Sequence, residues 1–431
     1  MSTGEKRKIG GGFHWFLIVL YMKMIWIWIC CGGRGHTYAR YAKDHGLRVV
    51  AAADSQPDKL QAFGKEFDIP AEMLFGDWRQ ALQSCNAVAL INATPDREHY
   101  QITVAALEKG LHVLLEKPMS PSEEECRHMV ALAEEKGLVV MVCHVLRYAP
   151  FFEKIQEIIS SGEIGTVTNL VMTENVVYWH FAHSYVRGIF SRQEDSSPFI
   201  LAKSCHDLDL IVYLTGKKCL SVMSEGELGY FRAENAPADA PMRCLDGCPH
   251  ETACPYFAPR LYMKSISHVG WPSTVISTDT SYDARYQALK TGRYGRCVYR
   301  CDNDVNDRQS ALFVMEDGVL ASFNMTGFSS ENTRTLRIFG TKGDVRAHMD
   351  DGEIVLSKFL DNQQQTFRID AQTLVSAHGG GDTRLLGSFA AALRGDTQDM
   401  RTCAATSLQS HLMAFAAEES RKTGRRVYIK E

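Results

Sequence analysis

The chain has 431 residues, of which 45% are hydrophobic and 23% charged, a composition typical of a globular protein. This length predicts two domains. With 47 basic and 51 acidic residues the net charge is −4, so no basic excess indicates a nucleic-acid partner. The 13 cysteines are odd in number and mostly scattered, which argues against a disulfide framework and favours a reducing, cytoplasmic compartment.

Residues 1–22 form an N-terminal extension that the predicted fold does not explain. A basic triplet at 6–8 precedes an apolar run from Phe13 to Cys31, a pattern typical of a signal peptide or membrane anchor. A glycine-rich turn follows at once and needs a buried strand before it, for which residues 24–30 are the candidate. Export or anchoring would remove that strand. We therefore expect a cytoplasmic protein without a membrane partner, with export or anchoring as the alternative.

Residues 23–148 alternate short apolar runs with amphipathic stretches. This pattern predicts a parallel sheet covered by helices on both faces, which is a Rossmann-type, doubly wound α/β domain. The expected strands are 24–30, 47–53, 87–92, 111–115 and 138–143, and the expected helices are 36–45, 57–67, 97–109 and 121–136.

Residues 149–431 show the period-two alternation of strands with one solvated face. They predict an α+β domain whose open, mainly antiparallel sheet carries helices on one side. A Pro- and Cys-rich insertion at 235–300 interrupts it. The expected strands are 167–174, 220–228, 309–315, 319–325, 335–340 and 344–349, and the expected helices are 151–161, 205–215, 382–394 and 402–423.

The glycine-rich segment lies between the first strand and the first helix, where a dinucleotide's pyrophosphate binds. With Gly35 as the third glycine of the motif and Gly32 as the second, Cys30 stands where the first belongs. Asp54 ends the next strand, and a carboxylate there binds the ribose hydroxyls and repels a 2′-phosphate, favouring NAD over NADP. The alternative is that Asp54 only forms a turn. The predicted phosphate turn comprises Gly32, Gly33, Arg34, Gly35 and His36.

Further motifs sit at the ends of the fourth and fifth strands and beyond. They are ATPD at 93–96 followed by His99, EKP at 116–118, HVLRYAP at 144–150, GEIG at 162–165 and HDLD at 206–209. With these motifs the chain resembles, over nearly its whole length, the Gfo/Idh/MocA family of glucose–fructose oxidoreductase-like and inositol dehydrogenase-like enzymes.

The resemblance implies an NAD-dependent oxidoreductase that moves hydride between nicotinamide and a hydroxyl-bearing carbon of a sugar, polyol or sugar derivative. Lys117 would bind the hydroxyl, its pKa lowered in a partly dry pocket, and His206 would be the second acid/base group. Family sugar dehydrogenases usually carry an Asp four residues before this His, where the chain has Ala202. The nicotinamide half of the site would be lined by Thr94, Pro95, His99 and Glu116.

The substrate is expected to contact polar residues from several segments. Lys203 lies beside the altered position 202, and Asp209 lies three residues after His206, on the same helical face. The HGGGD sequence at 378–382 lets backbone approach a ligand, although its Asp also suits a helix cap. The resemblance further implies a homo-oligomer, a dimer or tetramer, associating through the open sheet face. The substrate-binding candidates are Arg147, Tyr185, Lys203, Asp209 and His378.

Two alternative functions stay open. HGG motifs similar to the one at 378–380 occur in NAD-dependent glycosidases, which oxidise a sugar, eliminate the aglycone and reduce again. A non-catalytic sugar or nucleotide sensor is the other alternative, because Cys30 and Ala202 each replace a residue that the family usually carries at that position. The presence of Lys117 and His206 favours an enzyme.

The insertion carries a cluster of cysteines. Four thiolates from Cys244, Cys248, Cys254 and Cys301 have the number needed for a structural zinc site, with Cys297 as a spare. Their spacing is irregular, and no C-x2-C pair occurs among them. An iron–sulfur cluster or a set of free thiols are the alternatives.

Overall fold

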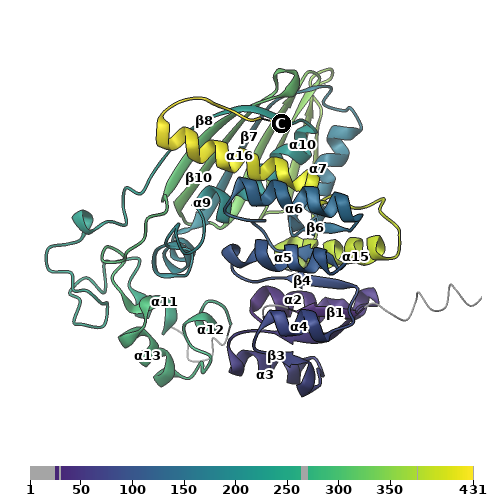
Figure 1. Cartoon of the computed structure of the whole chain (residues 1–431). Helices are drawn as coiled ribbons and strands as arrows, with labels where there is room; N and C mark the ends of the chain where they lie inside the picture. Colours follow the sequence, from purple (N-terminus) through teal and green to yellow (C-terminus); the bar gives the residue numbers. More distant parts are fainter. Residues whose placement is uncertain (1–24, 29–30, 264–269, 376, 431) are drawn as a thin grey trace, which may run out of the picture.

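The computed structural model describes residues 25–28, 31–263, 270–375 and 377–430. The expectations for residues 10–22 and for Cys30 lie outside these ranges. Two sheets form the framework, with the larger at the top of Figure 1 and the smaller below it. The predicted fold class, a Rossmann domain followed by an α+β domain with an open sheet, is confirmed.

The smaller sheet is entirely parallel, with strand order β3-β2-β1-β4-β5-β6. All five expected strands and four expected helices form. The two-residue strand β3 and the short helix α4 were not predicted, because neither is long enough to show a period. The strands are β1 Ile25–Trp28, β2 Arg48–Ala53, β3 Leu74–Phe75, β4 Ala89–Asn92, β5 His112–Leu115 and β6 Val140–Val142, and the helices are α2 Gly33–Ala42, α3 Pro57–Glu66, α4 Trp78–Ser84, α5 His99–Glu108 and α6 Glu123–Lys136.

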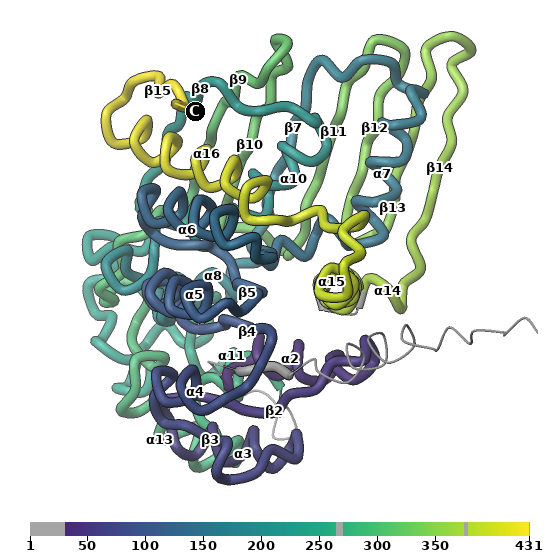
Figure 2. The backbone as a smooth tube through the Cα atoms, turned by 45° about the vertical axis from the view of Figure 1, so that its right-hand side comes forward, coloured from purple at the N-terminus to yellow at the C-terminus, as the bar shows by residue number. Residues whose placement is uncertain are grey.

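The larger sheet has nine strands in the order β14-β13-β12-β11-β7-β10-β9-β8-β15, and its single parallel pair is β7 with β10. Figure 2 shows α7 (Pro150–Ser160), α10 (Cys205–Thr215) and α16 (Ala404–Thr423) on one side of it. Alternate strand residues point into the core beneath these helices. The strands are β7 Val167–Val177, β8 Cys219–Glu227, β9 Arg308–Met315, β10 Leu320–Ser329, β11 Thr333–Gly340, β12 Gly343–His348, β13 Glu353–Lys358, β14 Gln364–Arg368 and β15 Val427–Tyr428.

Helix α15 (Gly381–Leu393) belongs to the second half of the sequence but packs on the first sheet. Its Leu385 and Phe389 share a buried cluster with Tyr38 of α2 and Ala52 of β2. The strand residues that point to the other face of this sheet, such as Leu90, pack against α4, α5 and α6. The predicted boundary at 148/149 therefore does not separate two independent cores, because the C-terminal segment completes the Rossmann domain.

The insertion folds around a small core of its own, at the lower left of Figure 1. Its helices are α11 Ala258–Tyr262, α12 Ser273–Ile276 and α13 Tyr282–Thr291. The buried Arg285 Nη1 donates to the carbonyl of Tyr262 at 2.7 Å, which joins α13 to α11. The remaining helices that bear on the site are α8 Tyr178–Phe181, the π-helical turn Ala182–Arg187, α9 Phe199–Ala202 and α14 Ala371–Val375.

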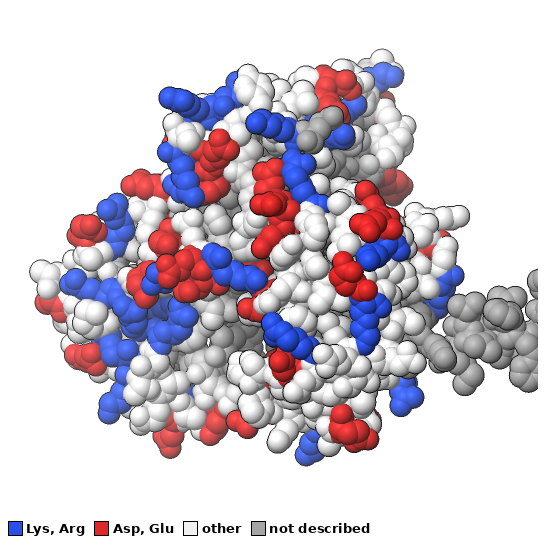
Figure 3. Space-filling view, in the orientation of Figure 1, with Lys and Arg blue, Asp and Glu red and all other residues white. Residues whose placement is uncertain are grey.

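Charged side chains of both signs are interspersed over the face shown in Figure 3. This distribution agrees with the small net charge of −4. Among the helices of the described ranges, none combines the length and apolar character that crossing a membrane requires.

Candidate active site

The phosphate turn opens helix α2 with exposed backbone N–H groups. Gly32 is extended, with φ −77° and ψ −174°, and caps the helix. A Cβ built on Gly33 would meet no atom within 4 Å, so the space beside the helix start is open to a ligand. His36 Nδ1 lies 3.0 Å from the Gly32 carbonyl, and its ring packs on Phe63. A helix N-terminus with this open approach fits the pyrophosphate of a dinucleotide.

Asp54 follows β2 and holds the turn directly. Its Oδ2 accepts a hydrogen bond from the Cys31 N–H at 2.8 Å, and its Oδ1 accepts one from the Gln56 N–H at 2.9 Å. Each carboxylate oxygen accepts more than one hydrogen bond, so this arrangement still permits a contact with ribose hydroxyls. Turn formation, the alternative considered for Asp54, is thus one of its functions.

Arg34 links the phosphate turn to two segments that are distant in the sequence. Its guanidinium lies 2.6 Å from Glu116 Oε1, at the end of β5, and also contacts Asp382 on α15 and the Tyr38 hydroxyl. Tyr38 donates to the same Glu116 oxygen at 2.7 Å. Burial alone would raise the pKa of Glu116, but the Arg34 guanidinium outweighs it and holds that pKa below its usual value. Glu116 is therefore ionised and holds the Arg34 guanidinium in place. The contact of Arg34 with Asp382 brings α15 against the phosphate turn.

Lys117 lies near His206 and contacts the backbone four residues before it. Lys117 Nζ donates to the carbonyl of Ala202 at 2.8 Å. His206 follows in the first turn of α10 and is 4% exposed. Burial, reinforced by the nearby Lys117 ammonium, lowers the pKa of His206 well below its usual value. The imidazole is therefore neutral at pH 7 and able to accept a proton.

His378 approaches this group from the turn before α15. Its ring centre lies 5.9 Å from that of His206. Its Nδ1 lies 2.9 Å from Oδ2 of Asp382. The structure thus brings together Lys117, His206 and His378, which come from three distant parts of the chain.

His99 links the loops that follow β4 and β5. Its Nδ1 lies 2.7 Å from the Pro118 carbonyl, and its Nε2 lies 2.8 Å from the Thr94 carbonyl. Thr94 in turn donates from Oγ1 to Asn92 Oδ1 at 2.7 Å. Because both ring nitrogens of the buried His99 are engaged, it holds the Thr94-Pro95 loop and the EKP loop in place instead of presenting a free nitrogen.

A buried ion network behind His206 was not predicted. Glu174 of β7 accepts from Lys203 at 2.8 Å and from Arg334 of β11 at 3.0 Å, and Arg334 Nε also donates to Asp207 at 2.6 Å. Burial raises the pKa of Asp207, while Lys203 and Arg334 overcome burial and lower the pKa of Glu174. Glu174 occupies an inward position between the apolar Met172 and Val176. A charge at an inward position of an alternating strand was the signal that could have revealed this network.

Comparison with known proteins shows which family the nucleotide-binding region matches. The family model described as "Oxidoreductase family, NAD-binding Rossmann fold" matches residues 28–144. YteT of Bacillus subtilis (strain 168) is 25% identical over 362 residues, covering 78% of this chain and 81% of that protein. The region 28–144 thus matches the Gfo/Idh/MocA family of oxidoreductases, which the sequence motifs also resemble.

Two further comparisons extend this result. D-xylose 1-dehydrogenase (NADP(+)) of Hypocrea jecorina is 35% identical over 133 residues, but the alignment covers only 30% of this chain and 33% of that enzyme. Among solved structures, the WlbA dehydrogenase from Bordetella pertussis, in complex with NADH and UDP-GlcNAcA, superposes with a TM-score of 0.68 at 18% identity. That superposition covers 95% of this chain and 98% of that one. The likeness shows that the fold is shared over both domains of this chain.

Three of the predicted substrate contacts are buried in this structure. Arg147 Nε and Nη2 donate to the two carboxylate oxygens of Asp209 at 2.6 and 2.7 Å, and this pair is shut off from solvent. Tyr185 is buried against Phe181 and Phe199. The structure therefore places Arg147, Asp209 and Tyr185 in the framework behind the site. Asp209 shares the helix α10 with His206 but is turned toward Arg147.

The four-cysteine zinc site is not supported. Within the described ranges, no three His, Cys, Asp or Glu side chains are grouped closely enough to hold a metal ion. Cys244 Sγ instead accepts from the Ala258 N–H at 3.4 Å, and Cys301 Sγ donates to the Cys297 carbonyl at 3.3 Å. Cys248 and Cys254 are half-buried free thiols. The cysteines lie on loops that the small core of the insertion already holds.

Proposed function

We propose that this Gfo/Idh/MocA oxidoreductase interconverts a hydroxyl and a carbonyl on a sugar, polyol or sugar derivative, with NAD as the hydride carrier. The observation that supports it most directly is the proximity of Lys117, which follows β5, to His206: Lys117 Nζ donates to the Ala202 carbonyl, and its charge acts on the His206 imidazole. The relatives that act on or bind sugars, including a D-xylose 1-dehydrogenase and a levoglucosan dehydrogenase in complex with NADH and levoglucosan, support the substrate class.

The residues of the turn fit the proposed cofactor. The first turn of α2 would hold the pyrophosphate, Asp54 the adenosine ribose, and the Thr94-Pro95 loop with Glu116 the nicotinamide half. When bound, NAD supplies the hydride acceptor at C4 of its nicotinamide ring. The open space beside Gly33 is the feature that a Cβ would fill.

The chain's own residues manage the hydroxyl and its proton. The Lys117 ammonium already donates to a carbonyl oxygen, and its further N–H groups hold the substrate oxygen. The neutral imidazole of His206 accepts the hydroxyl proton, as a general base must. Lys203, fixed by Glu174, supplies a further polar contact to the substrate in this proposal.

The test is to incubate the purified full chain with NAD and a panel of polyols and glycosides while following NADH absorbance and product identity together. The proposal expects NADH and carbonyl product in equal amounts, abolished by Lys117→Ala. Aglycone release without net NADH would instead identify the redox-assisted glycosidase, and sugar binding without turnover would identify the sensor.

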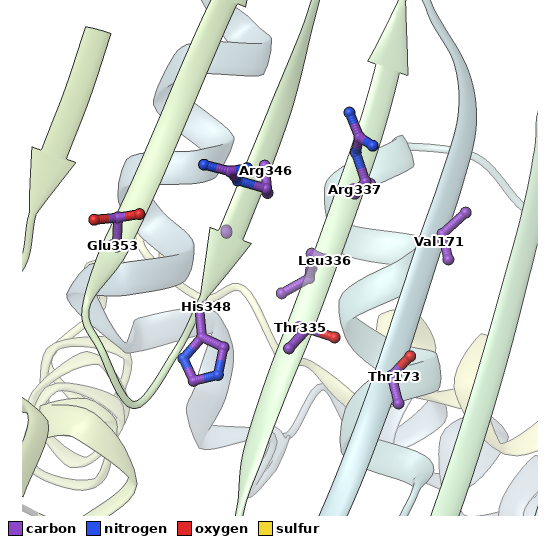
Figure 4. A pocket seen from close by; sticks show the side chains of 9 residues that line it. Val171, Thr173, Thr335, Leu336, Arg337, Arg346, His348 and Glu353 are labelled. Carbon is purple, nitrogen blue, oxygen red and sulfur yellow. The ribbon is translucent and has the colours of Figure 1, made fainter.

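The proposal includes a cytoplasmic homo-oligomer. The cysteines support a reducing compartment, because all 12 that the structure describes are free thiols. The open face of the larger sheet, opposite its helices, exposes Val171, Leu312 and Leu320. A shallow depression of about 430 Å³ on this face is lined by Thr335, Arg337 and their neighbours (Figure 4). We expect a dimer or tetramer by light scattering, and Leu320→Arg should shift it toward monomer.

A further inference from the structure

We propose that His378 and Asp382 form a proton-transfer dyad that serves His206 in place of the carboxylate missing at residue 202. The proposal rests on the proposed oxidoreductase function. The hydroxyl proton passes from the substrate oxygen to His206, then through one water to His378, and from His378 to solvent. His378 is thus a positioning residue that acts through His206.

The backbone around His378 is unusual. His378 has φ 48° and ψ 39°, and it is followed by Gly379 with φ 60° and Gly380 with φ 86°. Three successive residues in the left-handed backbone conformation cost conformational free energy when the first is not glycine. Such conformations are found preferentially at functional sites. The turn projects the imidazole of His378 toward His206 from the start of α15.

A buried carboxylate sets the ring orientation and tautomer of His378. Asp382 is 1% exposed, and its Oδ2 lies 2.9 Å from Nδ1 of His378. Burial alone would raise the pKa of Asp382, but its hydrogen bond from His378 and the nearby Arg34 lower that pKa to about 2, so it is ionised. An ionised carboxylate accepts the Nδ1 proton, which leaves Nε2 of His378 free to receive a proton.

The outward path from His206 leads to solvent. The two ring centres lie 5.9 Å apart, a separation that one water can bridge. The side chain of His378 is 38% exposed, whereas His206 is 4% exposed. His378 therefore lies between the buried base and bulk water.

The inward path stops. The ring of buried His144 lies 5.7 Å from His206, and Nδ1 of each is buried without a hydrogen-bond partner in the described structure. Beyond it, both ring nitrogens of His411 are occupied, one by the Met119 N–H and one by the Ser407 carbonyl, each at 2.8 Å. Ser410 Oγ connects His144 Nε2 with His411 Nδ1, at 3.4 Å from each, but this chain ends at the backbone groups around the fully buried His411, so the proton leaves through His378.

The charges on the two sides favour the same direction. Lys117, Arg334, His144 and His378 face His206, and all of them disfavour a positive charge there. A proton taken up by His206 is therefore readily handed on.

His378 has a different surrounding. Asp382 and Glu116 face it as carboxylates, and Arg34 is the cation near it. Burial and Arg34 lower the pKa of His378, while the two carboxylates work against this. Asp382 Oδ2 lies 2.9 Å from His378 Nδ1, whereas His206 Nδ1 has no hydrogen-bond partner in the described structure, so a proton in transit is held better at His378.

The first experiment uses two substitutions that suit a left-handed backbone. His378→Asn and His378→Gly preserve that conformation, since Asn and Gly both adopt it. We expect kcat to fall by roughly 10²-fold with KM changed less than about threefold, and added imidazole to restore turnover in His378→Gly. The matched control is His128→Asn, on the exposed surface of α6, which should behave as wild type. An unchanged kcat, or a loss that imidazole does not rescue, would overturn the proposal.

The second experiment needs no turnover. Long-range ¹H–¹⁵N spectra of the cofactor-free protein should show His378 protonated at Nδ1 in the wild type. Asp382→Asn should abolish this preference and lower the pKa of His378 further, because the carboxylate that raises it is lost. Spectra identical in wild type and variant refute the dyad. Wild-type protein without hydride transfer on any polyol refutes the proposed function instead, so the two failures are distinguishable.

Discussion

Lys117 Nζ donates to the carbonyl oxygen of Ala202 at 2.8 Å. A backbone carbonyl thus partly replaces the carboxylate that related sugar dehydrogenases usually place at this position. A carbonyl oxygen orients the ammonium but carries no full charge, so it offsets the neighbouring cations less than an aspartate would. The groups that act on His206 are Lys117, His144, His378 and Arg334, and all of them disfavour a positive charge on it.

Restoring the carboxylate should change the pH dependence. In Ala202→Asp, a negative charge near His206 raises the pKa of that histidine. Because His206 acts in its neutral form, activity should be lost at a higher pH as the solution is acidified. We expect the acidic limb of kcat/KM for oxidation to move up by about one pH unit or more. Ala202→Asn is the control of similar shape, and an equal shift in that variant would contradict the electrostatic explanation.

Cofactor choice should depend on the charge of Asp54. Asp54→Asn retains the side-chain oxygen that accepts from the Cys31 N–H, but it removes the repulsion of a 2′-phosphate. We expect the ratio of kcat/KM for NADP to that for NAD to rise by about tenfold or more, corresponding to about 1.4 kcal/mol. Asp58→Asn, in the first turn of α3, is the control. An unchanged ratio would show that Asp54 only forms the turn and does not select the cofactor.

The Arg147–Asp209 pair should matter chiefly to stability. Asp209→Asn leaves the buried Arg147 guanidinium without its charged partner, which should lower the free energy of unfolding by about 3–5 kcal/mol. The exposed ion pair of Arg40 with Glu66 is the comparison. Arg40→Gln should lower the free energy of unfolding by less than about 1 kcal/mol. Chemical denaturation measures both. A stable Asp209→Asn protein with raised KM would return Asp209 to the substrate site.

The Asp382 carboxylate should also contribute to stability in a pH-dependent way. Its pKa of about 2 in the folded protein lies below that of an unfolded aspartate. Its contribution, about 2 kcal/mol, is therefore complete above about pH 4 and is lost as the pH falls toward 2. The stability gap between wild type and Asp382→Asn should follow this course in denaturant titrations at several pH values. A gap that is constant from pH 7 to pH 2 would exclude an ionised Asp382.

Metal analysis should find less than about a tenth of an equivalent of zinc or iron in the purified protein, and a chelator should leave its thermal unfolding unchanged. The reason is the hydrogen bonding of Cys244 and Cys301 to groups other than a shared ion. One equivalent of bound metal, lost together with stability in Cys248→Ser, would reinstate the zinc hypothesis.

Most strands of both sheets were predicted because they follow from local patterns, whereas β3, β13, β14 and β15 were not. Lys117 ends a parallel strand, and the carboxyl ends of such strands share one edge of the sheet. The partners of these residues were not predictable in the same way. Arg34 meets Asp382 across 348 positions, and no period connects them.

The partners of Arg147 and Asp209 were not predictable either. Arg147 and Asp209 have the polarity of substrate-binding residues, but the fold pairs them with each other beneath the surface. Sequence shows that a side chain is charged, whereas only the assembled core shows whether its partner is protein or ligand.

Helix α15 covers one face of the nucleotide-binding sheet, although more than two hundred residues of the second domain separate it from that sheet. During synthesis the first domain leaves the ribosome with the apolar surface around Tyr38 and Ala52 uncovered, and it stays so until residue 393 has emerged. The nucleotide domain is thus among the first parts made and the last to be completed. For a nascent chain, that interval is the period of greatest exposure to aggregation and to chaperones.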